Sequence, residues 1–355
     1  MSSTSGLRIA VALPHLGIYG GVRRFFELSR HWLDRGHRVA LLIPASARER
    51  DPWLPFGGSL GTIDRLRSER WDVLLSPDPE LFLAADAPGA LRVFYAVLEK
   101  APGAERAWKS ADLVLANSSG MRRYLRRRGI DAADGIGGVN LATFHPPAID
   151  PRPERVQRGE PVRFLVYGRL SRPRKGTRLA VEAIRRALAR HAREGCPGGR
   201  LTLFDAPASA AEAPAMEEVP GVPTRWVLRP SQEELAGLYR DADVFVAAER
   251  RAGWCNTAAE AMASGAAVVC TPSGTADFAR HGETARVARL PWRWLLEAQL
   301  LAYLRDPESR LRTAARGAEA MRAYSWERTA ARVEAAIAAR LNGGGGDGSR
   351  DETST

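Results

Sequence analysis

The amino-acid sequence predicts an α/β protein built from two doubly wound parallel sheets. A chain of 355 residues exceeds the roughly 250–300 residues at which a single hydrophobic core stops growing, so two domains are expected. Short apolar segments alternate with amphipathic ones, as a parallel sheet with crossover helices requires. A proline-rich stretch at residues 146–161 interrupts this alternation, and we expect the linker between the domains there.

The first predicted domain, residues 1–150, opens with a strand at residues 8–13. A loop at residues 15–21 then leads into a helix with Val22, Phe25 and Trp32 on its apolar face. Further strands are expected at residues 38–43, 72–75, 91–96 and 112–116. Their nearly continuous apolar runs indicate strands that are buried on both faces.

The second predicted domain, residues 160–325, repeats this pattern. Its strands are expected at residues 162–167, 201–204, 225–228, 243–247 and 266–270. Helices are expected at residues 177–191, after a capping box that begins at Ser231, and at residues 257–263, 294–304 and 308–322. The two sheets should present the carboxyl ends of their strands to a central cleft, where such folds bind ligands.

Two segments follow the second domain. The helix at residues 326–341 places Trp326, Ala330, Val333 and Ile337 on one face. Residues 342–355 are rich in glycine and polar side chains, and we expect them to form a disordered tail.

The composition restricts the class of protein. The net charge of +11 favours an anionic partner, but almost all of the basic residues are arginine and no nucleic-acid-binding motif is present. The three cysteines form no Cys-x-x-Cys pair, which argues against a disulfide framework or a zinc site. No stretch approaches the ~20 apolar residues that span a bilayer, and no signal peptide precedes the first strand, so we expect a cytoplasmic protein.

Three segments carry candidate anion-binding chemistry. Gly20 and Gly21 follow the first strand, where backbone amides at a helix N-terminus can approach an anion, although an ordinary strand-to-helix turn has the same pattern. Residues 168–176 read Gly-Arg-Leu-Ser-Arg-Pro-Arg-Lys-Gly directly after the first strand of the second domain. Residues 252–265 open another helix, whose first amides are candidate phosphate or sugar ligands.

Together with Tyr324-Ser325-Trp326-Glu327-Arg328, these segments resemble glycosyltransferase family 4, the retaining enzymes of GT-B architecture. The resemblance implies that Gly20 and Gly21 face the donor or acceptor, and that Arg169 and Lys175 neutralise the diphosphate of a nucleotide sugar. It also implies that the helix after residue 325 crosses back to brace the first domain. Weaker similarity connects the chain to bacterial rhamnosyl and cell-surface polysaccharide transferases.

The Glu-x7-Glu motif of this family is incomplete here. Glu260 matches the second glutamate, which contacts the nucleotide ribose, but Ala252 stands at the first, sugar-holding position. Glu249 lies upstream and out of register, so we do not assign it this role. By resemblance, the other donor-binding candidates are Gly253, Cys255, Asn256 and Thr257. Alternatively, Thr257 and Glu260 form a helix capping box.

The acceptor candidates are His15, beside the glycine loop, and Glu99, after the strand at residues 91–96, with a surface carboxylate as the alternative for Glu99. The histidines and carboxylates form no metal-binding pattern. The resemblance therefore implies retaining transfer of a sugar from a nucleoside-diphosphate sugar to an acceptor hydroxyl without a metal cofactor. The pathway would be glycan, polysaccharide or glycoconjugate biosynthesis, with a glycan, lipid-linked or small-molecule acceptor and no nucleic acid.

Two other functions are considered. A catalytically silent GT-B binding protein is possible because of Ala252. A nicotinamide-dependent enzyme is disfavoured, because the first strand lacks a Gly-x-Gly-x-x-Gly turn and no acidic residue ends the strand at residues 38–43.

Residues 119–129 indicate a further property. Five arginines stand beside Met121, Tyr124 and Leu125 in this predicted helix. Such a basic amphipathic helix can lie on anionic lipid at the inner face of the membrane, although a solvated arginine-rich helix has the same pattern.

Overall fold

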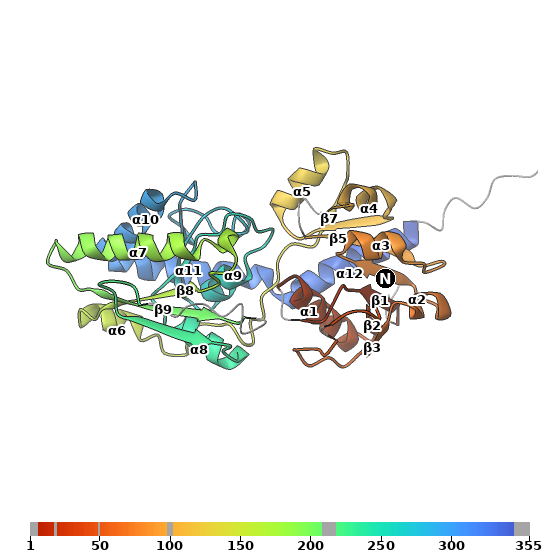
Figure 1. The fold of residues 1–355 in the computed structure, drawn as a ribbon, viewed down its shortest axis with the longest axis horizontal. Coiled ribbons are helices and arrows are strands. Elements are labelled where there is room, and N and C mark those ends of the chain that lie inside the picture. Colours follow the sequence, from red (N-terminus) through yellow and green to blue (C-terminus); the bar gives the residue numbers. More distant parts are fainter. Residues whose placement is uncertain (1–5, 18–19, 49, 98–101, 208–217, 344–355) are drawn as a thin grey trace, which may run out of the picture. The chain divides into compact units, whose positions relative to one another are not determined.

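The computed structural model describes residues 6–17, 20–48, 50–97, 102–207 and 218–343, and the chain divides into two compact units (Figure 1). The first unit comprises Met1–Gly138 and Trp326–Thr355, and the second comprises Val139–Ser325. Each unit contains one parallel sheet with helices on both faces, so each is doubly wound.

In the first unit the strand order is β3-β2-β1-β4-β5-β6-β7, and neighbouring strands run parallel. The strands are β1 (Arg8–Ala12), β2 (Arg38–Ile43), β3 (Ser59–Thr62), β4 (Val73–Ser76), β5 (Leu91–Ala96), β6 (Leu113–Ala116) and β7 (Ala133–Asp134). The helices are α1 (Gly20–Asp34), α2 (Arg65–Ser68), α3 (Pro79–Ala84), α4 (Ala104–Ser110), α5 (Ser119–Arg126) and α12 (Trp326–Gly343).

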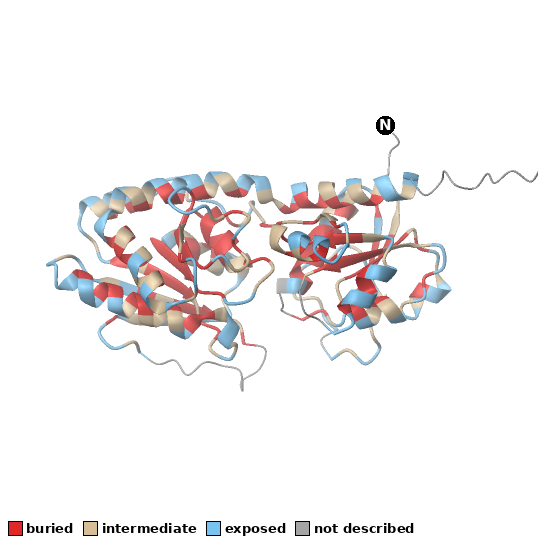
Figure 2. Ribbon diagram, turned by 90° about the horizontal axis from the view of Figure 1, so that it is seen from above, coloured by how far each residue is buried: buried red, intermediate tan, exposed pale blue. Residues whose placement is uncertain are grey.

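Successive residues of these strands face two cores. Ile9 and Val11 of β1 belong to a core shared with α1 and α12, whereas Ala10 and Ala12 face the opposite side of the sheet. Figure 2 shows buried residues along the strands of each unit. Because both faces of the sheet are covered, successive residues of a central strand are buried, and the sequences of these strands are therefore continuously apolar.

The helix α12 is part of the first unit. Trp326, Ala330, Val333 and Ile337, predicted to share a face, are all buried in the core with α1. Asn342 and Gly343, expected in the disordered tail, continue the helix, and residues 344–355 lie outside the described residues.

In the second unit the strand order is β10-β9-β8-β11-β12-β13. The strands are β8 (Val162–Tyr167), β9 (Gly199–Asp205), β10 (Thr224–Leu228), β11 (Val244–Ala247), β12 (Ala267–Cys270) and β13 (Arg286–Val287). The helices are α6 (Arg152–Gln157), α7 (Thr177–Ala192), α8 (Gln232–Asp241), α9 (Asn256–Ala263), α10 (Arg293–Arg305) and α11 (Pro307–Met321), with short 3-10 turns at Pro173–Lys175 and Arg322–Tyr324. The capping box at Ser231 and Glu234 is confirmed.

The expected linker forms part of the second unit. The stretch at residues 146–161, expected to interrupt the alternation of helices and strands, contains the helix α6, with Pro153 in its first turn where proline is tolerated. The Arg155 Nη2 atom lies 2.6 Å from Asp243 Oδ1, and Phe144 packs edge-on against Tyr239. These contacts attach the segment to α8 and to the residue before β11, and the second unit begins at Val139.

Gly138 packs directly against Trp326, the first residue of α12. Its φ is +138°, and an added Cβ would lie 2.0 Å from ring atoms of Trp326. We expect Gly138→Ala to lower the free energy of unfolding by about 3 kcal/mol or more, because the clash adds to the backbone strain. Gly129→Ala is the control, with φ of +74° and open space, and should cost only about 1 kcal/mol. Urea unfolding measures both, and equal losses would contradict the prediction.

Candidate active site

The carboxyl ends of β8 and β11 meet where the connections of the second sheet reverse. From β8 the chain proceeds outward through β9 and β10, and then returns to the other side of β8 to form β11 and β12. Ligands bind at such a topological switch point in doubly wound sheets. The loops after β8 and β11 are therefore the candidate site.

Two glycines shape the loop after β8. An added Cβ on Gly168 would lie 2.5 Å from the Trp226 ring. Gly176 has φ of +68°, and its Cβ would lie 1.9 Å from the carbonyl oxygen of Ala248, the first residue after β11. Only glycine allows this approach, which holds the loop against the exit of β11 and starts α7.

Arg169 is buried and anchored to the neighbouring strand. Its Nη1 atom donates to Asp205 Oδ1 at 3.2 Å and to the carbonyl oxygen of Ala206 at 2.8 Å. The Asp205 side chain is fully buried at the end of β9. Arg169 therefore contributes to the structure of the site as well as to its charge.

Lys175 is more accessible than Arg169, with 24% of its side chain exposed. Its Nζ lies 2.5 Å from Glu249 Oε1 and 5.6 Å from the centre of the Tyr167 ring. Burial raises the pKa of Tyr167 to about 12, so this phenol is neutral at physiological pH. Lys175 is thus held by a carboxylate and an aromatic face at the edge of the sheet.

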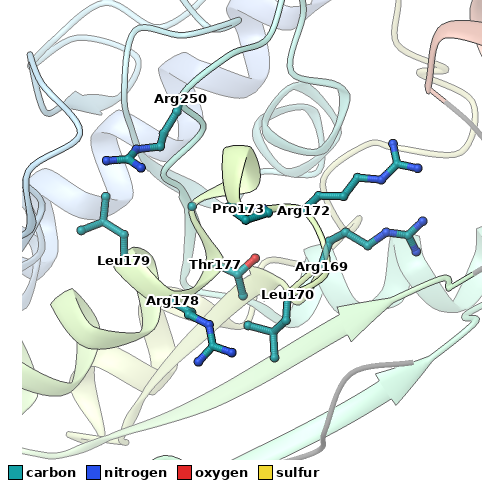
Figure 3. Close-up of a pocket in the computed structure, with 9 residues that line it drawn as sticks. Arg169, Leu170, Arg172, Pro173, Thr177, Arg178, Leu179 and Arg250 are labelled. Carbon is teal, nitrogen blue, oxygen red and sulfur yellow. The ribbon is translucent and has the colours of Figure 1, made fainter. Parts of the chain in front are cut away.

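A pocket of about 240 Å³ opens at the N-terminus of α7 (Figure 3). Its lining is rich in arginine and comprises Arg169, Leu170, Arg172, Pro173, Gly176, Thr177, Arg178, Leu179 and Arg250. Figure 3 shows Arg169 and Arg172 extending in the same direction, with Arg250 and Arg178 at other sides of the pocket. Four arginines and the positive end of a 16-residue helix border this pocket, which makes it a candidate site for an anion.

The N-cap residue of α9 is not the one that the sequence predicted. The helix begins at Asn256 with Cys255 as the N-cap residue, so Thr257 lies within the helix and the capping-box interpretation is wrong. The Cys255 amide donates to the carbonyl oxygen of Gly274 at 2.8 Å, so this amide is not offered to a ligand. Asn256, Thr257 and Gly253 are partly exposed.

Glu260 lies in the interior of the second unit. It is 5% exposed, and its Oε2 atom accepts a hydrogen bond from the Tyr239 hydroxyl at 3.2 Å. Cys255 is also buried, and burial, together with the charge of Glu249, raises the pKa of its thiol to about 12. This thiol is therefore protonated at physiological pH.

Sequence reasoning did not assign Glu249, which is the carboxylate closest to Lys175 among the described contacts. Its position two residues after the end of β11 was the available signal, because strand ends at a switch point carry ligand-binding groups.

The candidate residues of the first unit are Gly20, Gly21, His15 and Glu99. Gly20 and Gly21 are the first residues of α1, and open space surrounds a Cβ built on Gly21. The His15 Nδ1 atom accepts a hydrogen bond from the Gly17 amide at 3.1 Å. Glu99 lies outside the described residues.

The apolar side of α5 faces the protein. Met121 and Leu125 are buried, and Tyr124 packs edge-on against Trp108. The core of the first unit covers Met121 and Leu125, so a lipid surface could be met only by the other side of this helix. The exposed side of the helix and its C-terminal turn consists of five arginines: Arg122, Arg123, Arg126, Arg127 and Arg128.

Within the described ranges, no group of three histidine, cysteine, aspartate or glutamate side chains is arranged to hold a metal ion. No helix in that part of the chain is both long and apolar enough to cross a membrane.

Comparison with known proteins supports a glycosyltransferase. Residues 161–302, which include the whole pocket, match the family model described as glycosyl transferases group 1. The lipopolysaccharide core biosynthesis mannosyltransferase LpcC of Rhizobium leguminosarum bv. viciae is 33% identical over 174 residues, which are 48% of this chain and 49% of that protein. The chain thus matches about half the length of this curated relative.

Solved structures share the fold over nearly the whole chain. Anabaena HepE in complex with UDP and glucose superposes with a TM-score of 0.71 at 15% identity, covering 94% of this chain and 100% of HepE. WaaG, a glycosyltransferase involved in lipopolysaccharide biosynthesis, gives a TM-score of 0.68 at 14% identity. The match covers 92% of this chain and 98% of WaaG. The predicted GT-B fold of two Rossmann-like domains is therefore confirmed, and residues 161–302 match the glycosyl transferases group 1.

Proposed function

We propose that this protein is a retaining glycosyltransferase of family 4 type, which transfers a sugar from a nucleoside-diphosphate sugar to an acceptor hydroxyl. The observation that carries the proposal is the arginine-lined pocket at the N-terminus of α7. The pocket follows the first strand of the second sheet, and in doubly wound folds the turn after the first strand commonly binds phosphate groups.

The chemistry of glycosyl transfer explains why cations are needed there. As the bond between the anomeric carbon and the phosphate oxygen breaks, negative charge grows on the departing diphosphate. Fixed cations near that oxygen stabilise the transition state more than the bound donor. Lys175 and the pocket arginines would supply this stabilisation, and we propose that they do so without a metal ion.

Retention of configuration is proposed through attack on the same face of the sugar. The acceptor oxygen forms its bond to the anomeric carbon while the phosphate oxygen leaves, and that oxygen takes the acceptor proton. The pocket would then hold a nucleoside diphosphate as the product.

The relatives indicate the class of substrates. LpcC is named as a mannosyltransferase of lipopolysaccharide core biosynthesis, and HepE was solved with UDP and glucose. We therefore propose a nucleotide-sugar donor and an acceptor from lipopolysaccharide or polysaccharide synthesis. The alternative, a catalytically silent binding protein, is not favoured by these similarities.

A donor screen tests the proposal. Nucleotide release is measured with UDP-, GDP-, ADP- and dTDP-sugars, with and without a glycan acceptor, in EDTA and in Mg²⁺. We expect release with at least one donor, at similar rates in both buffers, because arginine and lysine replace the metal charge. Release only in Mg²⁺ would contradict the metal-free mechanism, and no release from any donor would favour the binding protein.

Arg169 and Lys175 each pair with a buried carboxylate, so substitution of either should affect both catalysis and stability. Lys175→Met should lower kcat/KM at least about tenfold, because it removes a charge-assisted contact of about 1.5–3 kcal/mol, and should also lower the free energy of unfolding, because the Glu249 carboxylate loses this partner. Arg169→Ala leaves the buried Asp205 carboxylate without this partner and should also lower the free energy of unfolding by about 3–5 kcal/mol. Steady-state kinetics and urea unfolding separate the two effects. Unchanged kinetics in Lys175→Met would exclude it from the site.

We also propose a peripheral contact with anionic membranes through the arginines of α5. All five arginines are exposed, and the apolar side of the helix is buried, so electrostatic attraction would be the binding force.

This contact predicts binding to vesicles of phosphatidylcholine and phosphatidylglycerol at low salt, with release at high salt because screening weakens the attraction. Arg123, Arg126 and Arg127 changed together to glutamine should reduce co-sedimentation. A variant with Arg186, Arg190 and Arg193 of the α7 region changed to glutamine carries the same charge change and should sediment as the wild type. Equal loss in both variants would indicate net charge alone.

A further inference from the structure

Two segments of the second unit run side by side at the candidate site. The Arg250 amide donates to the carbonyl oxygen of Arg174 at 2.8 Å, and Gly176 lies against the carbonyl oxygen of Ala248. Lys175 and Glu249 are the middle residues of these two segments. The backbone on both sides therefore fixes their separation.

Glu249 is a buried carboxylate. Its side chain is 4% exposed, and its main-chain carbonyl oxygen accepts a hydrogen bond from Thr271 Oγ1 at 2.5 Å. Oε1 lies 2.5 Å from Lys175 Nζ, while Oε2 is buried without a hydrogen-bond partner in the described part of the chain. Burial of a carboxylate with one unsatisfied oxygen opposes folding, so a requirement other than stability is indicated.

The neighbouring position 252 has no carboxylate. The Ala252 amide donates to Ser273 Oγ at 2.9 Å, and its methyl group lies 2.7 Å from where a Cβ on Gly274 would stand. The carboxylate at the candidate site is therefore that of Glu249, just after the end of β11. It stands three residues before Ala252, the position at which the Glu-x7-Glu motif has its first glutamate.

We propose that Glu249 is a positioning residue that holds the Lys175 ammonium in place for the departing diphosphate. The inference rests on the proposed function. One N–H of the ammonium binds Glu249, and the remaining N–H groups can be offered to phosphate oxygens. A flexible lysine side chain gains from such an anchor, because less conformational freedom is lost when the diphosphate binds.

A double-mutant cycle tests this coupling. UDP, GDP, ADP and dTDP are titrated into the full-length protein by calorimetry, and the tightest becomes the probe, with its monophosphate for comparison. Glu249→Gln keeps the shape of the side chain but removes its charge. We expect roughly tenfold weaker diphosphate binding, less than about twofold change for the monophosphate, and no further loss when Glu249→Gln is added to Lys175→Met.

Glu182→Gln is the matched control. Glu182 pairs with Arg185 and Arg186 at 2.8 Å on α7, and its loss should leave both affinities unchanged. Thermal melting of every variant reports folding separately from binding.

The outcomes are distinguishable. Losses that multiply in the double variant would overturn the proposal, because Glu249 would then act independently of Lys175. Equal weakening of diphosphate and monophosphate would also overturn it, in favour of a purely structural carboxylate. If the wild-type protein binds none of the four diphosphates, the proposed function itself fails and the inference fails with it.

Discussion

The approach of Gly176 to the carbonyl oxygen of Ala248 is the constraint on which the candidate site depends. Any other residue would place its Cβ 1.9 Å from that oxygen, at a φ of +68° that side chains rarely adopt. The contact presses the loop after β8 against the exit of β11. It thereby brings Lys175 to Glu249, starts α7, and places the pocket arginines around the first turn of that helix.

The arginines of this chain serve different purposes, although the composition cannot distinguish them. Arg24 is buried, where it donates to the Tyr95 hydroxyl and lies over the Trp326 ring, and Arg155 is buried beside Asp243. Each of these guanidinium groups packs inside its own unit and adds little to the accessible surface charge. The exposed positive charge that can attract an anion is instead concentrated in places such as the α7 pocket and the surface of α5.

The carboxylates near the site show how a motif can be altered while its position in the fold is kept. Glu260 lies where the motif has its second glutamate, but its side chain is buried against Tyr239. Ala252 stands at the first position, whereas Glu249, three residues earlier in the same segment after β11, contacts Lys175. Several consecutive residues after a strand end lie close to the switch point of a parallel sheet, so a carboxylate at position 249 is still near the candidate site.

Local patterns in the sequence were sufficient for the fold and for the loop that lines the candidate pocket. Apolar periodicity predicted the main strands of both sheets and the buried face of α12, and the glycine- and arginine-rich segment after β8 identified the loop that lines the pocket. Only the tertiary structure decided that Arg169 is tied to Asp205, that Glu249 meets Lys175, and that residues 139–160 belong to the second unit. Arg169 and Asp205 are 36 residues apart along the chain, and Lys175 and Glu249 are 74 residues apart. Side-chain pairing over such separations depends on strand order and loop packing, which periodicity within a short window does not contain.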